Sequence, residues 1–285
     1  MKEKFTLFDA VIYLIMAFIL VVTLYPLLHV IAVSFSESSA ILQNKVGIIP
    51  KGFSLDAYAK ILETMKVPRA FMNSVLYTVV GTAINLAMTA LMAYPLSKPN
   101  LVGRGVFMKL IIFTLLFNGG TIPTYLVVQS LGLIDSMWSL VLPNAIWTME
   151  LFIQVSFYRS LPSSLFESAK LDGASELTIL LRIVLPLSKA SLASIALFYF
   201  MGHWNSYFLP LIYLSSGEKF PLQLVLKDML ISDSTMVSGL VESAALTPAA
   251  VKNATIFVTM VPVMLVYPFA QKYFVKGVMI GSIKG

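Results

Sequence analysis

The sequence has no cysteine, only two histidines and few charged residues. Without cysteine the chain can form neither a disulfide framework nor a thiolate metal site. Two histidines, His29 and His203, are too few on their own to hold a structural zinc ion. Asp, Glu, Lys and Arg together make up 12% of the 285 residues, whereas soluble domains carry about 25%. The scarcity of charge argues against a soluble protein.

Apolar residues are correspondingly abundant, at 58% of the chain, and the mean hydropathy is +0.85. A membrane-spanning helix needs about 20 predominantly apolar residues. Stretches of that length with little or no charge lie at residues 9–37, 69–98, 109–135, 135–159, 189–218 and 252–272. They predict an all-α polytopic membrane protein with six transmembrane helices. The first stretch exceeds the apolar core of about 7–15 residues in a signal peptide, so we expect it to be retained.

The distribution of charge between the loops predicts the orientation of these helices. If the N-terminus is cytoplasmic, so are residues 97–109, residues 159–188 and the tail at 273–285. Lys and Arg outnumber Asp and Glu in these segments, as the positive-inside rule requires. Both termini are therefore predicted to be cytoplasmic, and the net charge of +6 reflects topology rather than nucleic-acid binding. We expect one membrane domain, residues 1–285, with long outer loops at 37–69 and 214–252.

The polar segment at 159–188 interrupts this apolar chain with the stretch "ESAKLDGASELTILLRIVLPL". Ser164 and Glu167 have the spacing of a capping box, which predicts that a helix begins there. Gly173 would end that helix in a left-handed conformation, and Ser175 would cap a second helix. A helix of two turns is shorter than the roughly 12–15 residues needed for stability in water. It must therefore pack on its own membrane domain or on a separate cytoplasmic partner.

This stretch resembles the signature of the membrane subunits of bacterial ATP-binding-cassette (ABC) importers that work with a solute-binding protein. That signature begins Glu-Ala-Ala, here Glu167-Ser168-Ala169 with serine for the first alanine, and continues to Asp-Gly-Ala, here Asp172-Gly173-Ala174. Other segments resemble the carbohydrate-uptake branch, in its subgroup allied to polysaccharide and oligosaccharide uptake. They are "PKGFSLDAYAKIL", "FNGGTIPTYLVVQSLGLIDSMW", "HWNSYFLPLIYL" and the terminal "QKYFVKGVMIGSIKG".

The resemblance implies a permease subunit that moves a carbohydrate, expected to be an oligosaccharide, by alternating access. In the family the signature forms a coupling helix that fits a cleft in the ATP-hydrolysing subunit. The implied coupling residues are Glu167, Ser168, Ala169, Asp172, Gly173 and Ala174. The chain itself is then not an enzyme and carries no cofactor, because ATP and magnesium would bind to the partner subunits. The tail at 273–285 should contact the ATPase dimer.

The family also implies the assembly and its location. We expect a second, non-identical permease subunit that forms a heterodimer with this chain, two ATP-binding-cassette subunits, and an external solute-binding protein that delivers the carbohydrate. The location implied is the bacterial cytoplasmic membrane, with the chain crossing the bilayer several times. No nucleic-acid partner is expected.

Polar residues within spans are candidates for a translocation path, because burying them in lipid is costly. "FNGGTIP" predicts a break in the third span, as discontinuous helices often mark transporter sites. Trp and Tyr could stack on sugar rings, and Asn could bond hydroxyl groups. The expected path residues are Asn118, Gly119, Gly120, Glu150, Trp204, Asn205 and Tyr207, within a wider polar set that adds Asn73, Asn85, Asn144 and His203. The alternative for each is helix packing or an interfacial aromatic belt.

Two alternative functions stay open at this point. The chain could serve the same importer family with a non-sugar cargo, or it could be a secondary transporter or channel that needs no ATPase. No phosphate-binding loop ending in Gly-Lys-Ser/Thr occurs, so ATP energy would have to come from another subunit. The capped polar segment at 159–188 distinguishes an ATPase-driven importer from a channel, because a channel does not need such a cytoplasmic segment.

Overall fold

The computed structural model describes residues 6–63, 66–231 and 246–282, and within these ranges it is helical without a strand. The expected all-α class is confirmed. A single isolated antiparallel bridge pairs Ser36 with Phe53. The α-helices are α1 (Leu7–Ser34), α2 (Ser38–Leu42), α3 (Asp56–Glu63), α4 (Lys66–Ser97), α5 (Arg104–Leu116), α6 (Thr121–Ser130), α7 (Trp138–Val141), α8 (Thr148–Ser160), α9 (Ser163–Leu171), α10 (Glu176–Ile179), α11 (Leu185–Leu187), α12 (Lys189–Trp204), α13 (Phe208–Tyr213), α14 (Leu222–Ile231) and α16 (Pro248–Ser282).

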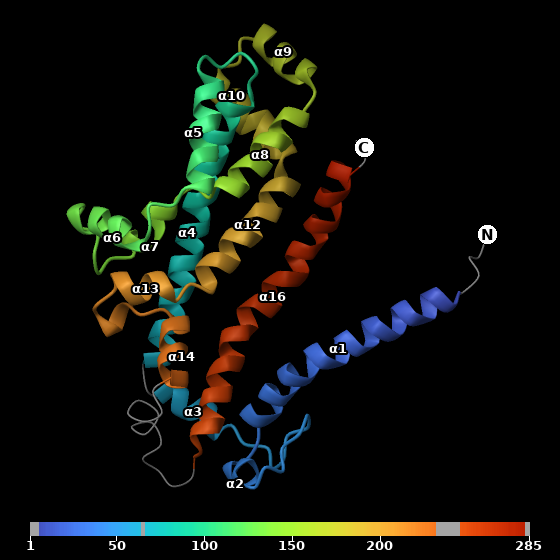
Figure 1. Ribbon diagram of the computed structural model, residues 1–285, viewed down its shortest axis with the longest axis vertical. Helices are drawn as coiled ribbons and strands as arrows, with labels where there is room; N and C mark the ends of the chain where they lie inside the picture. The colour runs from blue at the N-terminus through green and yellow to red at the C-terminus, as the bar shows by residue number, and fades with distance from the viewer. Residues whose placement is uncertain (1–5, 64–65, 232–245, 283–285) are drawn as a thin grey trace. The chain divides into compact units, whose positions relative to one another are not determined.

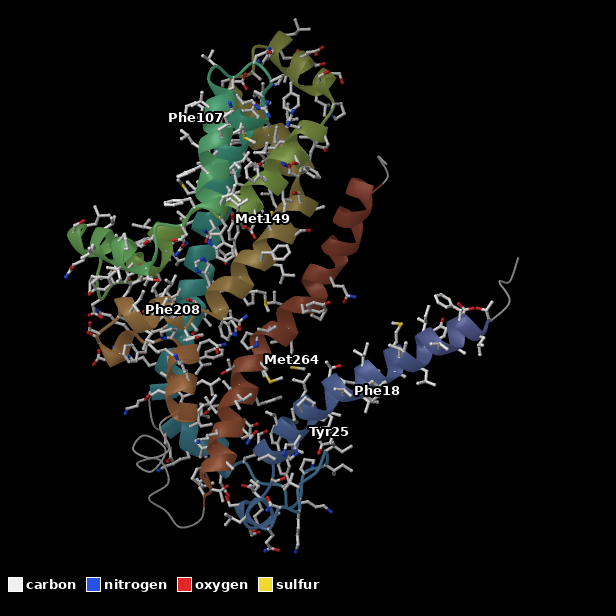
Figure 2. All side chains as sticks on the ribbon, viewed as in Figure 1. Phe18, Tyr25, Phe107, Met149, Phe208 and Met264 are labelled. Carbon is white, nitrogen blue, oxygen red and sulfur yellow. The ribbon has the colours of Figure 1, made fainter. Side chains whose placement is uncertain are left out.

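The chain forms two compact units, and each is described by itself. Unit 1 comprises residues 1–69 and 225–261. Its α1 begins with the Thr6 capping box and is exposed along most of its length. Figure 2 shows Phe18 and Tyr25 directed away from the α1 axis. An apolar helix surface of this kind suits lipid rather than water.

A small aromatic cluster holds the far end of α1 within unit 1. The Phe35 ring stacks on Tyr58 of α3, and both meet the edge of Phe257 on α16. The Tyr58 hydroxyl donates to Ser34 Oγ at 2.8 Å. The short helix α3 begins at Asp56, which donates its backbone N–H to the Ser54 hydroxyl at 3.1 Å.

Unit 2 comprises residues 70–224 and 262–285. Within it α8 contacts both α5 and α12, and Figure 1 shows α4, α5 and α8 running beside one another. Buried residues of α4, α8, α9 and α10 form one apolar cluster that includes Tyr94, Leu151, Tyr158, Ala169 and Ile179. The polar segment at 159–188 therefore packs on its own membrane helices at one end of the unit.

Within the described ranges, three helices are individually long and apolar enough to cross a bilayer: α1, α4 and the first part of α16, residues 248–268. Three bent pairs would each suffice if taken as one span. The bends are 115° between α5 and α6, 49° between residues 138–144 and α8, and 81° between residues 176–187 and α12. The break predicted in the third span is confirmed, since α5 ends at Leu116 and α6 begins at Thr121.

The fifth apolar stretch, residues 189–218, is less regular than a continuous span. Its helix α12 ends at Trp204, and α13 starts only at Phe208. The chain before α12 is irregular too, because residues Leu180–Val184 form a π-helical segment between α10 and α11. Each π turn holds one residue more than an α turn.

The ends of the predicted loops fall partly outside the described ranges. Within the loop at 214–252, residues 214–231 and 246–252 are described and include α14, and residues 232–245 lie outside. The tail at 273–285 continues the backbone of α16 as far as Ser282. Residues 283–285 lie outside the described residues.

Candidate functional site

The segment at 159–188 forms two short helices joined at a sharp corner, as expected, but its first helix does not begin as predicted. The predicted capping box of Ser164 and Glu167 is wrong, because the N-cap position falls two residues earlier, at Pro162, and α9 starts at Ser163. Pro162 holds the N-cap position with an extended backbone and makes no side-chain cap. The fixed φ of proline suits the entry into a helix, so the helix starts directly after it and Ser164 falls inside the first turn.

The corner itself follows the prediction. Gly173 has φ +76°, the left-handed region in which a side chain is strained. Two residues later, the Ser175 hydroxyl accepts the backbone N–H of Thr178 at 3.2 Å and caps α10. The corner is therefore fixed by local backbone geometry as well as by packing.

The six expected coupling residues divide into two groups. Ala169 is buried in the apolar cluster formed by α4, α8, α9 and α10, and Ala174 packs against that cluster. Both therefore anchor the corner to the membrane helices. The other four are exposed: Glu167, Ser168, Asp172 and Gly173. Leu171, which the sequence reasoning missed, is 89% exposed directly before the corner. An apolar side chain presented so openly beside two carboxylates is suited to insertion into a partner protein.

A charged cluster ties this corner to the end of α4. The Glu176 carboxylate accepts hydrogen bonds from the Tyr94 hydroxyl at 2.5 Å and forms ion pairs with Lys170 at 2.9 Å and Lys98 at 3.3 Å. The Tyr94 hydrogen bond and the Lys170 ammonium lower the pKa of Glu176 to about 2. Glu176 is therefore ionised throughout the neutral range and holds both lysines.

Lys98 connects the cluster to α9. Its ammonium group lies 4.4 Å from the centre of the Tyr94 ring and 4.2 Å from that of Phe166. A cation placed over two aromatic faces is attracted by both ring quadrupoles. Phe166 of α9, Glu176 of α10 and Tyr94 of α4 are thus joined through one side chain.

Five of the seven expected translocation residues lie at two different helix breaks. Asn118, Gly119 and Gly120 occupy the exposed link between α5 and α6, where Asn118 Oδ1 accepts the Gly120 N–H at 2.8 Å. Asn205 and Tyr207 occupy the link between α12 and α13 and are also exposed.

Two other expected path residues are buried. Trp204 is only 2% exposed and packs between the rings of Phe71 and Phe200. Glu150 is buried in the first turn of α8. A carboxylate at that position interacts favourably with the helix dipole. The roles of both in translocation stay predictions.

Three members of the wider polar set come together inside unit 2. Asn85 of α4 donates its amide to the Asn144 carbonyl at 2.6 Å, and its Oδ1 lies 2.6 Å from His203 Nε2. Nearby, the hydroxyls of Thr89 and Tyr199 are 2.6 Å apart. The sequence reasoning named Asn85, Asn144 and His203 but missed Trp147, whose ring contacts both Tyr199 and His203.

Asn73, the fourth member of the wider polar set, makes its hydrogen bonds to backbone carbonyl groups of unit 2. Its amide donates to the backbone carbonyls of Glu218 at 2.8 Å and Phe220 at 3.1 Å. It therefore fastens α4 to the segment that precedes α14.

Apolar helices broken at several points, with polar groups gathered at the breaks, define a helical membrane transport protein. No protein-family model matches the chain. It is 44% identical over 288 residues, covering 100% of both chains, to the polygalacturonan/rhamnogalacturonan transport system permease protein YtcP of Bacillus subtilis. It is 46% identical to protein LplC of the same organism over 266 residues, which cover 93% of this chain and 90% of LplC.

A solved structure agrees with these relatives. One chain of a bacterial ABC transporter involved in the import of the acidic polysaccharide alginate superposes with a TM-score of 0.89 at 31% identity, covering 96% of this chain and 100% of that one. This chain belongs to the family of permease proteins of carbohydrate ABC transport systems.

Proposed function

We propose that this permease moves an oligosaccharide inward across the bacterial cytoplasmic membrane by alternating access. Support for the cargo class comes from the relatives, which are named for polygalacturonan and rhamnogalacturonan transport and for alginate import. All of these cargoes are chains of sugars. An external solute-binding protein delivers the oligosaccharide, and this chain and its partners pass it through the bilayer.

The proposed topology has six spans with both termini in the cytoplasm, within one domain of residues 1–285. The bent pair α5–α6 and the bent pair of residues 138–144 with α8 each count as one span beside α1, α4 and α16, and α12 provides the sixth span after the cytoplasmic segment at 159–188. Exposed apolar side chains on unit 2, such as Phe107, Met149 and Phe208 in Figure 2, would contact lipid or the second permease subunit. The excess of Lys and Arg in the proposed cytoplasmic loops supports this orientation.

The corner at Gly173 is the observation that carries the coupling role. It presents Glu167, Leu171 and Asp172 outward, while Ala169 and Ala174 are held by the core. A partner that grips this corner would move the helices to which it is fastened. In the proposed complex that partner is one of two ATP-binding-cassette subunits, which hold ATP and magnesium and perform the hydrolysis that this chain does not.

The remaining partners are a second, non-identical permease subunit and the solute-binding protein. We place the binding protein on the outer loops at 37–69 and 214–252, whose charged residues would set partner choice and encounter rate. Replacing residues 214–252 by a short Gly-Ser linker should raise the apparent dissociation constant of the binding protein. An unaltered constant would remove this loop from the interface.

The coupling role is tested by Gly173→Val in the complete transporter, reconstituted with its partner subunits. Valine at φ +76° strains the corner, so stimulation of ATP hydrolysis by the loaded binding protein should be lost while the complex still assembles. Gly105→Val is the matched control, because Gly105 lies in α5 with open space around its Cα and no left-handed backbone. Normal stimulation in Gly173→Val would refute the coupling role, and uptake without any ATPase subunit would indicate a channel or secondary transporter.

A further inference from the structure

A cavity of about 170 Å³ lies within unit 2 where two helix breaks meet. One break separates the turn at Leu142–Asn144 from α8, and the other separates α12 from α13. The lining is mixed, with aromatic faces, amide and hydroxyl groups and apolar carbons. It includes Asn144, Trp147, Gly202, His203 and Ser206.

The Trp147 indole is held against the cavity by an unusually close helix approach. A Cβ atom on Gly202 would lie 2.0 Å from Trp147 Cη2, so any side chain at position 202 would displace the ring. Tyr199 packs edge-on against the same indole, with centroids 5.0 Å apart. Position 202 therefore has to be glycine for the Trp147 indole to occupy its place in the wall of the cavity.

The hydrogen bonds of Asn85 settle which nitrogen of His203 carries a proton. Asn85 must direct its NH₂ group at the Asn144 carbonyl, because that carbonyl can only accept. Asn85 Oδ1 is then the atom that faces His203 Nε2, so Nε2 carries the hydrogen and donates it. A Cβ on Gly81 would lie 2.6 Å from the same Nε2, which places this edge of the ring against α4.

Because Nε2 is engaged by Asn85, Nδ1 is the remaining imidazole nitrogen, and His203 is among the residues that line the cavity. In the neutral ring Nδ1 is an acceptor, and no hydrogen bond to it occurs among the residues that the structure describes. The cavity thus combines a flat indole face, an acceptor at His203 and the Ser206 hydroxyl. Aromatic faces and small hydrogen-bonding groups are what a sugar ring needs from a binding site.

We propose that this cavity binds one uncharged pyranose unit of the cargo, an inference that rests on the proposed function. Among the residues that the structure describes, no Lys or Arg lines the cavity. A uronate carboxylate would therefore be buried without a counter-charge, which costs several kcal/mol. The cavity therefore favours hydroxyl-bearing rings over carboxylated ones, so in a cargo that mixes neutral and acidic sugars it would take the neutral units.

The test uses the absence of native cysteine in this chain. Ser206→Cys is introduced into the complete transporter in nanodiscs, and its reaction with methyl methanethiosulfonate is followed by the mass of this chain. Methyl β-D-glucopyranoside and methyl β-D-glucuronide form a probe pair that differs by a carboxylate, and the galacto-configured pair is tested beside it. Ser215→Cys, exposed and outside the cavity lining, is the control for reagent and solvent effects.

The neutral glycoside should slow modification at position 206 about twofold at a concentration equal to its dissociation constant, following simple mass action. The glucuronide should not slow it, and neither sugar should protect position 215. Adding Gly202→Ala, which displaces the indole, should remove the protection, whereas Gly105→Ala should leave it intact.

Equal protection by the neutral and carboxylated sugars would overturn the assignment to uncharged rings. The absence of protection by all four glycosides at concentrations up to their solubility would overturn the site itself. Uptake and stimulated ATP hydrolysis are measured on the same preparation. If these persist while the protection fails, the cavity proposal falls and the proposed function stands.

Discussion

The Tyr94 hydroxyl donates a 2.5 Å hydrogen bond to the Glu176 carboxylate and so joins the C-terminal end of α4 to the first residue of α10. These residues are 82 positions apart in the sequence. The polar corner is therefore fastened to α4 as well as to its neighbours in sequence, α8 and α12. A displacement of the corner would reach three membrane helices at once.

Tyr94→Phe removes this hydrogen bond but keeps the ring beneath Lys98. The loss of a hydrogen bond to a charged group is worth about 1.5–3 kcal/mol when shielded, and less here because Glu176 is half exposed. We expect a several-fold weaker stimulation of ATP hydrolysis, with unstimulated hydrolysis unchanged. Tyr25→Phe, on the exposed surface of α1, is the control. Equal stimulation in Tyr94→Phe and wild type would show that the bond transmits nothing.

The two glycine contacts around the buried polar network predict a stability defect. A Cβ at Gly202 would meet the Trp147 indole at 2.0 Å, and one at Gly81 would meet the His203 ring at 2.6 Å. Gly202→Ala and Gly81→Ala should each destabilise the permease by about 1–3 kcal/mol, the usual cost of overpacking. Thermal unfolding in detergent measures this. Gly105→Ala, which meets no atom, should be neutral or stabilising, and three equal melting temperatures would contradict the packing argument.

Thr89 and Tyr199 share a buried hydrogen bond of 2.6 Å between α4 and α12. Hydrogen bonds between membrane helices contribute about 0.6 kcal/mol on average. A double-mutant cycle with Thr89→Val and Tyr199→Phe should give a coupling energy of that order in unfolding measurements. Strict additivity of the two single substitutions would mean that the pair adds no stability.

Asp135 predicts a pH dependence of stability. Its carboxylate accepts hydrogen bonds from Lys219 Nζ at 2.6 Å, the Ser216 hydroxyl at 2.7 Å and two backbone N–H groups. The Lys219 contact, followed by those from Ser216 and Ser215, holds the pKa of Asp135 well below its usual range. A depressed folded-state pKa stabilises the fold above the ordinary carboxyl pKa of about 3.9, and this contribution is lost as pH falls below it.

The melting temperatures of wild type and Asp135→Asn should therefore differ by a constant amount between neutral pH and mildly acidic pH. The difference should shrink once the pH falls below the ordinary carboxyl range. A difference that stays the same down to the most acidic measurable pH would contradict the role of the ionised carboxylate.

Features governed by local chemistry were predictable from sequence. The break at residues 117–120 follows from two adjacent glycines, the corner from Gly173, and the cap of α10 from Ser175. The N-cap of α9 was missed by two residues, because the capping-box spacing of Ser164 and Glu167 was weighed without the fixed φ of Pro162, which suits the entry into a helix.

The contacts between helices could not be predicted in the same way. Apolar stretches identify candidate spans but not the rotation of each helix about its axis. That rotation decides that Gly202 faces Trp147, that His203 faces Asn85, and that Trp204 is enclosed rather than presented to a path. The sequence around Glu176 likewise does not indicate its hydrogen-bond partner, because Tyr94 belongs to a helix far away in the sequence.

The widened turn at Leu180–Val184 also influences how the chain bends into α12. One additional residue in a helical turn rotates the side chains that follow in the same helix by about 100° relative to an uninterrupted α-helix. If this turn tightened, Leu185–Leu187 would rotate about the helix axis, and the 81° bend into α12 would point in another direction. Five residues beside the coupling corner therefore help to set the direction in which α12 leaves it.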